Sequence, residues 1–142
     1  MPIRKAEAVW EGNLKEGKGE MKLGSGAFEG NYSFGSRFEE SPGTNPEELI
    51  GAAHAGCFSM ALSHGLAQAG YSPTSVSTKA KVYLEKVDDG FKITTIELNT
   101  EAVIPDIEES EFLKHTEAAK TGCPVSRALT GVDIKLQAKL IE

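Results

Sequence analysis

The amino-acid sequence predicts an α+β fold with a mainly antiparallel sheet and one long central helix. Stretches in which apolar and polar residues alternate occur both before and after a helical stretch near the middle of the chain. A period of two residues is typical of half-buried strands, and the central stretch has the start and stop signals of a helix. Strand-rich parts on both sides of one long helix indicate the α+β class.

The first 44 residues predict two or three short strands. They are rich in glycine and contain turn-like stretches such as EGNLKEGKG and GSGAFEG. Between these turns lie short alternating runs, for example Ala6, Ala8 and Trp10 in AEAVW. Short alternating runs bounded by glycine-rich turns are typical of small antiparallel sheets.

A helix is expected from Asn45 and Pro46 to about Gln68, with Gly70 as its stop signal. Thr44 and Glu47 have the spacing of a capping box. Some 23 helical residues at about 1.5 Å each give a length of about 35 Å. Much of one side carries small residues: Gly51, Ala52, Ala55, Gly56, Ser59 and Ser63. We expect another backbone to approach this side closely, and the helix to be covered on most sides.

The part after the helix predicts a hairpin, a second helix and a last strand. Residues 76–84 alternate, Asp88-Asp89-Gly90 is a tight turn, and the partner strand slips in phase near Thr94 and Thr95, which indicates a bulge. Residues 107–122 follow an amphipathic helical pattern, and a short helix is expected to begin at Pro124. Alternation returns over residues 132–140. We expect one domain over residues 1–142.

Composition and charge exclude several classes of protein. The chain has 142 residues, a net charge of −6, 39% hydrophobic and 25% charged residues, with both signs mixed. Nucleic acids and anionic membranes select basic patches, so neither is an expected partner. Residues 49–69 contain two histidines and many small residues, which argues against a membrane span. The sequence begins without the pattern of a secretory signal, so we expect a cytoplasmic protein whose thiols are kept reduced.

Two cysteines are the candidates for chemistry, and local context does not separate them. Cys57 lies on the central helix, where ideal geometry places Ile50, Met60 and Ala61 on the same side, as well as His54 and His64. Apolar surroundings keep a thiol inert, so the question is which cation could ionise it. His54 could form a dyad with it, although a helical histidine is more often packed or hydrogen-bonded.

Cys123, in TGCPVS, lies between the end of one expected helix and the start of the next. Amide donors and the dipole of the short helix could stabilise a thiolate there. A buried free cysteine in a tight turn is an equally good interpretation.

No metal, nucleotide or other cofactor is expected. His54 and His64 are about 15 Å apart along the helix, which is too far to share one ion. The cysteines lack the paired spacing of zinc ligands, and no glycine-rich phosphate-binding motif follows a strand.

The stretch GTNPEELIGAAHAGCFSMAL, with SRFEE upstream and TGCPVS downstream, resembles the OsmC/Ohr family of osmotically inducible protein C and organic hydroperoxide resistance proteins. The resemblance is closer to the OsmC branch and extends over the whole chain, with Gly56 where many relatives have alanine.

The resemblance implies a thiol-dependent peroxidase that reduces organic hydroperoxides in oxidative and osmotic stress defence. Cys57 would be the attacking thiol and Cys123 the resolving thiol of a Cys57–Cys123 disulfide. Arg37 would be the cation beside the thiolate, and Glu47 its carboxylate partner. The family further implies an intertwined homodimer with sites at the subunit interface. A dithiol would act as the reductant.

Simpler interpretations stand beside these roles. Arg37, next to Glu39 and Glu40, could be a solvated loop charge, and Glu47 could only cap its helix. Glu47 precedes Cys57 by ten residues, about 15 Å of straight helix, so we expect it to act near the Cys57 of a second subunit. The alternative functions are a non-enzymatic dimer that binds a lipid-like ligand, and a structural dimer with inert cysteines.

Overall fold

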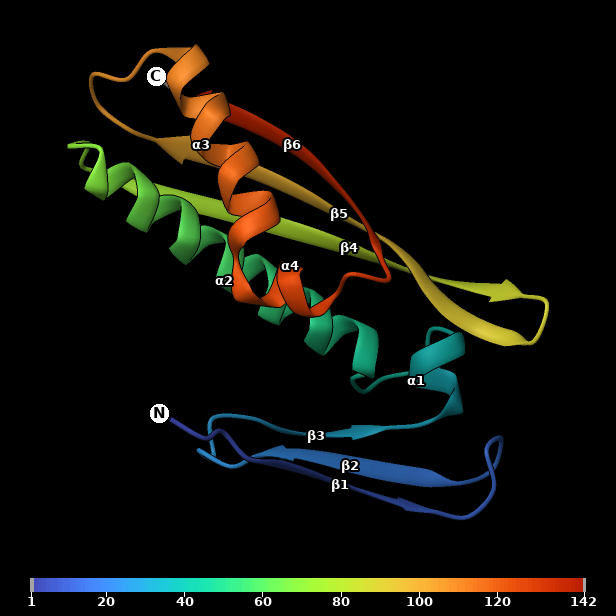
Figure 1. Cartoon of the computed structure of the whole chain (residues 1–142). Helices are drawn as coiled ribbons and strands as arrows, with labels where there is room; N and C mark the ends of the chain where they lie inside the picture. Colours follow the sequence, from blue (N-terminus) through green and yellow to red (C-terminus); the bar gives the residue numbers. More distant parts are fainter. Residues whose placement is uncertain (1, 142) are drawn as a thin grey trace. The chain divides into compact units, whose positions relative to one another are not determined.

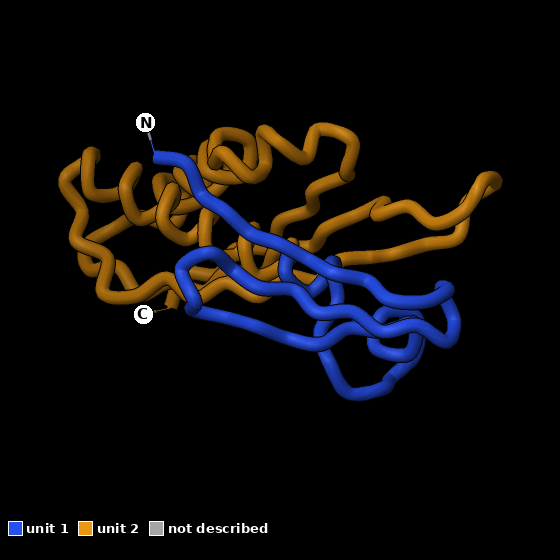
Figure 2. Tube along the Cα trace, turned by 90° about the horizontal axis from the view of Figure 1, so that it is seen from below, with its two compact units in different colours: residues 1–49 blue, residues 50–142 orange. Residues whose placement is uncertain are grey.

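The predicted strands and helices are present within residues 2–141, the part of the chain that this computed structural model describes. The chain divides into two units, residues 1–49 and residues 50–142 (Figure 2). Each unit has a three-stranded sheet of its own. The prediction of one domain over residues 1–142 stays a prediction.

The first unit contains the three short strands β1 (Ala6–Glu11), β2 (Lys18–Leu23) and β3 (Glu29–Tyr32). They form an antiparallel sheet in the order β1-β2-β3, which confirms the strand prediction for this region. Gly19 pairs with Trp10 on one side and Tyr32 on the other. A Cβ at Gly19 would lie 2.6 Å from the Trp10 ring and 2.5 Å from the Tyr32 ring, so the two aromatic rings occupy the space that a side chain there would need.

A short helix, α1 (Phe34–Phe38), follows β3 and was not predicted. Its start is fixed by a capping box in which the Ser33 hydroxyl accepts from the backbone N–H of Ser36, and the Ser36 hydroxyl accepts from that of Ser33. One turn and a half is too short to produce a helical period in the sequence. This helix carries Arg37.

The long helix α2 (Pro46–Gln68) confirms the predicted span, but its cap differs from the prediction. Asn45 is the capping residue, because its Oδ1 accepts from the backbone N–H of Glu48 at 2.7 Å. Thr44 donates to the Glu48 carboxylate at 2.8 Å. The Thr44–Glu47 capping box is therefore wrong, and the Glu47 carboxylate is used elsewhere. Among residues 2–141, no helix combines the length and apolar character needed to cross a membrane.

One side of α2 is buried and the other is exposed. Phe58, Leu62 and Leu66 are fully buried, whereas Met60 is 77% exposed. The prediction that α2 is covered on most sides is therefore wrong for the single chain. Close approach does occur at Gly51, where a Cβ would lie 3.2 Å from a Val82 methyl group, but a Cβ at Gly56 would meet open space.

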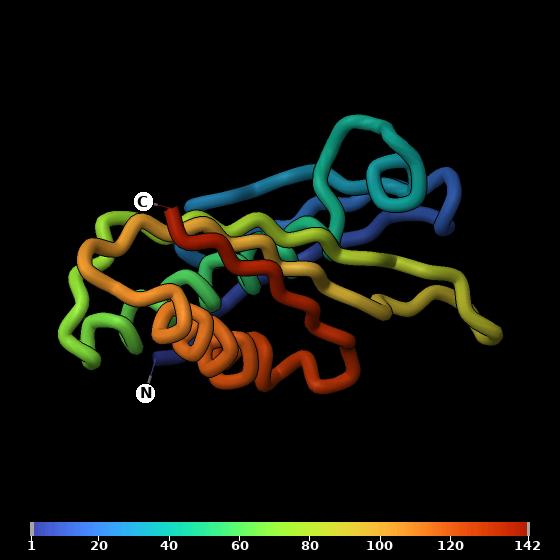
Figure 3. Tube along the Cα trace, turned by 90° about the horizontal axis from the view of Figure 1, so that it is seen from above, coloured from blue at the N-terminus to red at the C-terminus, as the bar shows by residue number. Residues whose placement is uncertain are grey.

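The second unit is built on the sheet β4-β5-β6 (Figure 3), formed by β4 (Ser75–Val87), β5 (Gly90–Val103) and β6 (Asp133–Ile141). β4 and β5 are the predicted antiparallel hairpin, and β6 runs parallel to β5. Tyr83 pairs with Thr95 and Leu84 with Ile93, so Thr94 is the extra residue of the predicted bulge.

The helices α3 (Glu109–Gly122) and α4 (Pro124–Ala128) confirm the two helices predicted before the last strand. Alternate residues of β5, from Ile96 to Ala102, are buried in one core with side chains of α2 and α3 such as Phe58 and Phe112. Because these β5 residues share one face, α2 and α3 both cover that face of the sheet (Figure 1). The core lies between this face of the sheet and the two helices.

Candidate functional site

The first unit contains a charged pair, Arg37 of α1 and Glu47 of the first turn of α2. Arg37 Nε lies 3.1 Å and 3.2 Å from the two Glu47 carboxylate oxygens, and Arg37 Nη2 lies 2.9 Å from Oε2. The Glu47 side chain is 9% exposed and that of Arg37 is 35% exposed. The interpretations of Arg37 as a solvated loop charge and of Glu47 as a helix cap are therefore wrong. The pair is a fork in which a buried carboxylate orients a partly exposed guanidinium.

Donors of Arg37 remain for another group. A guanidinium has five N–H donors in one plane, and the bonds to Glu47 use the Nε side of that plane. The Arg37 guanidinium carbon also lies 5.3 Å from the centre of the Phe38 ring. Carboxylate and ring hold the side chain in one orientation, so the remaining N–H groups point in a defined direction and can bind a peroxide oxygen or a thiolate.

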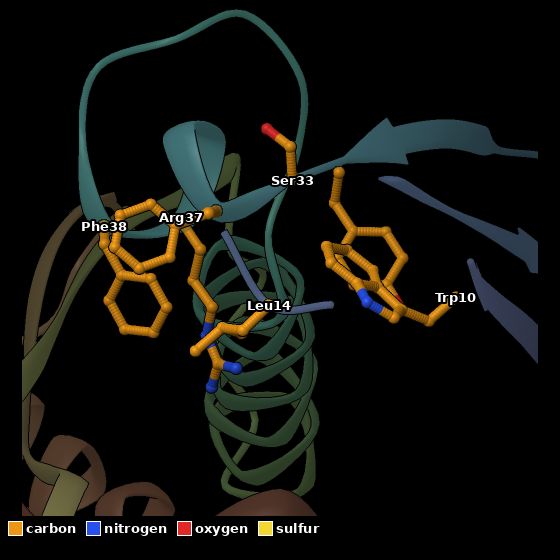
Figure 4. A pocket seen from close by; sticks show the side chains of 7 residues that line it. Trp10, Leu14, Ser33, Arg37 and Phe38 are labelled. Atoms are coloured by element: carbon orange, nitrogen blue, oxygen red, sulfur yellow. The ribbon is translucent and has the colours of Figure 1, made fainter. Parts of the chain in front are cut away.

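Arg37 also lines a pocket in the first unit (Figure 4). The pocket has a volume of about 190 Å³. Its aromatic and aliphatic lining residues are Trp10, Leu14, Tyr32, Phe34 and Phe38, and its polar ones are Ser33 and Arg37. Its Trp10 indole donates to the Gly12 carbonyl at 3.0 Å, which fixes that ring. A cation at the wall of an apolar pocket suits a ligand that has one polar end and one apolar end.

The second unit contains both cysteines, and both are free thiols. Cys57 lies midway along α2 and is half-buried, whereas Cys123 is fully buried at the junction of α3 and α4. The two side chains are close enough for the Cys123 thiol to affect the pKa of Cys57 through a hydrogen bond and through its charge. The structure therefore brings the two predicted redox residues together, although they are far apart in sequence.

Cys123 has a structural task as well. Its backbone N–H donates to the Ala119 carbonyl at the end of α3, and its Sγ accepts from the backbone N–H of Ser126 at 3.3 Å at the start of α4. Pro124 occupies the first turn of α4, where its missing N–H costs no hydrogen bond. The sequence CPVS thus makes the sulfur a helix cap and fixes its position.

The surroundings of Cys57 within its own unit oppose ionisation. Burial raises the pKa of the Cys57 thiol, and the neighbouring Cys123 raises it further. The backbone N–H of Val125 acts in the opposite direction by hydrogen bonding to the sulfur, but more weakly than burial. A reactive thiolate at Cys57 therefore needs a further positive charge.

His54 does not provide that charge. Its ring is fully buried, and its Nε2 lies 2.7 Å from the Ser126 hydroxyl. Burial lowers the pKa of His54, which favours the neutral imidazole. The apolar surroundings expected for Cys57 are only partly formed in the single chain. Ile50 and Ala61 pack against the core with Cys57, whereas Met60 and His64 are exposed.

Sequence reasoning missed two sets of residues. The first is the aromatic lining of the Arg37 pocket, for which spacing along the chain gives no signal. The second is Ser126, which contacts both Cys123 and His54. Its position three residues after Cys123 is the spacing of a helix cap and could have drawn attention to it.

Among the described residues, no three His, Cys, Asp or Glu side chains are grouped as metal ligands.

Comparisons with known proteins agree with this arrangement. The profile of the OsmC-like protein family matches residues 38–137. Peroxiredoxin OsmC of Escherichia coli strain K12 is 54% identical over 127 residues, which cover 89% of each chain. Organic hydroperoxide resistance protein OhrB of Bacillus subtilis strain 168 is 35% identical over 104 residues, or 71% of this chain and 74% of the relative.

A solved structure has a similar fold. The crystal structure of an organic hydroperoxide resistance protein OsmC from Legionella pneumophila superposes with a TM-score of 0.75 at 26% identity, covering 98% of this chain and 99% of that one. Family profile, sequence relatives and fold therefore point in one direction, and this chain belongs to the OsmC-like protein family, which the sequence resemblance had indicated.

Proposed function

We propose that this protein is a cysteine-based peroxidase that reduces organic hydroperoxides to alcohols. The observation that carries the proposal is the pair of free thiols, with half-buried Cys57 next to buried Cys123. The relatives named peroxiredoxin OsmC and organic hydroperoxide resistance protein support it. A pair of neighbouring thiols can be oxidised and reduced in a cycle without a bound cofactor.

Cys57 is the attacking residue in this proposal, because it is the more accessible thiol. Its thiolate attacks the terminal oxygen of the hydroperoxide and the O–O bond breaks. The alkoxide leaves and takes up from solvent the equivalent of the proton that Cys57 released on ionising, which gives the alcohol, while Cys57 becomes a sulfenic acid. The Cys123 thiol then attacks the Cys57 sulfur, and water leaves as the disulfide forms. A dithiol reductant reopens the disulfide by exchange, and a reducing compartment such as the cytoplasm suits this cycle.

Arg37 is the cation that lowers the pKa of Cys57 in this proposal, and Glu47 orients it. The forked pair supports this role, because a permanent charge held by a buried carboxylate needs no reorganisation during the reaction. Opposite charge within about 4–6 Å lowers the pKa of an acidic group by about 1–3 units, which acts against the effect of burial on Cys57.

The pocket beside Arg37 is the proposed site for the organic group of the hydroperoxide. Its aromatic and aliphatic lining would bind an alkyl or aryl group, and the guanidinium would bind the peroxide oxygens. Hydrogen peroxide has no apolar group to place there, so we expect it to be the poorer substrate. The apolar lining therefore supports organic hydroperoxides as the substrate class.

A homodimer is part of the proposal. Glu47 and Cys57 are separated by about 15 Å along α2, so Glu47 does not easily serve the thiol of its own chain. Arg37 is paired with Glu47, so we expect both residues to act at the same thiol. We therefore propose that Arg37 and Glu47 of one copy act on Cys57 of a second copy, related by a twofold axis. The exposed side of α2, which includes Met60, is available for such a contact.

A hydroperoxide titration tests the function. Reduced protein treated with one equivalent of an organic hydroperoxide should lose two thiols, release one equivalent of alcohol, and yield a Cys57–Cys123 disulfide peptide. The rate should rise with the size of the apolar group until the pocket is filled, and hydrogen peroxide serves as the matched control. Survival of both thiols while the ligand binds would instead support a non-enzymatic binding protein.

A further inference from the structure

Ser126 lies between the buried thiol and the buried imidazole of the second unit. The Cys123 thiol donates to Ser126 Oγ over 3.1 Å, and Ser126 Oγ lies 2.7 Å from His54 Nε2. The backbone N–H of Ser126 donates to Cys123 Sγ at 3.3 Å. Cys123 and His54 are 0% exposed and Ser126 is 5% exposed. The three side chains thus form one continuous chain of hydrogen bonds inside the core.

These hydrogen bonds allow an arrangement of protons that leads from the thiol to the imidazole. Because the Cys123 thiol proton points to the Ser126 oxygen, the hydroxyl proton of Ser126 is free to be donated to His54 Nε2. Nε2 is then the acceptor of a neutral imidazole whose proton is on Nδ1. Burial lowers the pKa of His54, which is consistent with a neutral ring. The chain runs from S–H through O–H to an unprotonated nitrogen.

Packing alone does not explain why an imidazole occupies this position. His54 Nδ1 is buried, and no hydrogen-bond partner for it is present among the described residues. Leaving a buried polar group unpaired is unfavourable, and an apolar side chain of similar size would avoid this cost. The polar contact that His54 does make leads to Ser126 and then to Cys123. The ring is therefore directed at the thiol.

Cys123 needs such a partner for the second half of the proposed cycle. Attack on a sulfenic acid requires the thiolate, and a thiol with no solvent exposure does not give its proton directly to bulk water. An internal acceptor next to the thiol removes this difficulty. His54 Nε2 is such an acceptor, and the Ser126 hydroxyl connects the two.

We propose that Ser126 and His54 form a proton relay that activates Cys123 for disulfide formation. The inference rests on the proposed function, in which Cys57 has become a sulfenic acid. The Cys123 thiol proton passes to Ser126 Oγ as the Ser126 hydroxyl proton passes to His54 Nε2. The Cys123 sulfur, which is oxidised, forms the S–S bond with the Cys57 sulfur, which is reduced.

The Cys57 S–O bond breaks with its electron pair remaining on oxygen, and the hydroxide takes back the proton held by His54 and leaves as water. The net reaction joins one sulfenic acid and one thiol into a disulfide and one water. His54 and Ser126 are thus positioning and proton-transfer residues for the resolving step, and the attack of Cys57 on the peroxide does not require them.

Solvent is the competing proton acceptor. Ser126 also lines an open cavity of about 450 Å³, whose wall includes Lys120 and Arg127. Water in that cavity would be an alternative acceptor for the Ser126 proton, and His54 would then only hold the hydroxyl in place. The two accounts differ in what a glutamine at position 54 does, because its amide can hydrogen-bond to Ser126 but accepts no proton at neutral pH.

The test separates the two halves of one turnover. Reduced protein is mixed with one equivalent of cumene hydroperoxide, and peroxide loss and disulfide formation are followed separately by rapid quench and mass spectrometry. In the His54→Gln and Ser126→Ala variants, peroxide loss should stay within about twofold of the unsubstituted protein. Disulfide formation should slow by about 100-fold, the lower range for loss of a general base, and dimedone should trap the sulfenic acid.

Controls make each outcome decisive. His64→Gln replaces an exposed histidine of the same helix and should change neither step. Ser126→Thr restores the hydroxyl and should recover disulfide formation, which a role in packing alone would not predict. Normal disulfide formation in His54→Gln overturns the relay in favour of solvent. Equal slowing of both steps in a folded variant overturns it in favour of a structural role. Absence of thiol loss in the unsubstituted protein instead refutes the proposed function itself.

Discussion

The two units hold complementary halves of the proposed chemistry in contrasting environments. In residues 1–49, a guanidinium that is 35% exposed is paired with a buried carboxylate beside an apolar pocket. In residues 50–142, two thiols and a neutral imidazole are buried or half-buried, and burial raises the pKa of Cys57. Within residues 50–142, burial thus favours the protonated Cys57 thiol. The guanidinium of residues 1–49 carries a permanent charge, and in the proposed mechanism the reactivity of Cys57 depends on that charge.

The largest expected effect comes from removing the attacking thiol. Cys57→Ser should abolish hydroperoxide turnover, because the proposed attack on the peroxide is made by the Cys57 thiolate, which this variant lacks. Cys123→Ser should instead allow one equivalent of peroxide to be reduced and then stop, since the sulfenic acid cannot form its disulfide. For both variants, peroxide loss is measured in a single turnover, and the sulfenic acid is detected by dimedone labelling. A full first turnover by Cys57→Ser would assign the attack to Cys123.

Removing the cation should have the next largest effect. Arg37→Met keeps an apolar stem but no charge, so the pKa of Cys57 should stay raised by burial, as in its own unit. The thiolate then forms only at more alkaline pH, and the midpoint of the alkylation rate of Cys57 should move up by about 1–3 pH units. Peroxide reduction at neutral pH should fall by about 10- to 1000-fold. Arg37→Lys, which keeps the charge without the fork, is the control and should lose less.

A mixed dimer tests whether the two halves come from different copies. Glu47→Gln removes the carboxylate charge that orients Arg37, and we expect about a tenfold loss of activity. When Glu47→Gln and Cys57→Ser chains are combined in one dimer, a site shared between copies restores one intact site, because one chain supplies Glu47 and the other supplies Cys57. Tagged heterodimers should then recover about half the activity of the unsubstituted dimer. Heterodimers no more active than the Glu47→Gln protein would place Glu47 and Cys57 of one chain in one site.

The smallest expected effect is on the free energy of unfolding, and it tests only the unit of residues 50–142. The pKa of folded His54 is lowered below its ordinary value of 6.5 by burial. The unfolded chain therefore binds the proton more readily below this pH, and the stability associated with neutral His54 is lost as pH falls. For one group the slope is at most about 1.4 kcal/mol per pH unit. Urea unfolding at pH 7.5 and pH 5 should show a smaller acid loss for His54→Gln than for His64→Gln. Equal losses would contradict a buried neutral ring.

The predictable parts of the molecule are those governed by local patterns. The span of α2, the β4–β5 hairpin and the bulge at Thr94 follow from periodicity and turn signals in adjacent residues. α1 was missed because five residues contain too little of a helical period. The Thr44–Glu47 cap was wrong for a different reason. The Glu47 carboxylate has a stronger partner in Arg37, and Asn45 takes over the capping.

The site itself was only partly predictable. Cys57 and Cys123 were candidates from the sequence itself, but their separate roles, and the choice of Arg37 and Glu47, came through resemblance to a family. Nothing in their spacing shows which of the four are neighbours. The contact between His54 and Ser126 joins residues 72 positions apart, so it depends on how α4 packs beside α2. Sequence patterns report on neighbours within a few residues, and this contact lies outside their reach.

The double role of Cys123 at the ends of α3 and α4 has a consequence for redox potential. In the dithiol state its sulfur caps α4 by accepting from the backbone N–H of Ser126. Capping oxygens contribute about 0.5–2 kcal/mol, and a sulfur, which is a weaker acceptor, belongs at the lower end of this range. If disulfide formation draws the sulfur out of this cap, the reduced protein is favoured by that amount. The reduction potential of the pair then rises by about 10 mV, since 1.4 kcal/mol corresponds to about 30 mV for two electrons. A helix end would thus help the disulfide to accept electrons from its reductant.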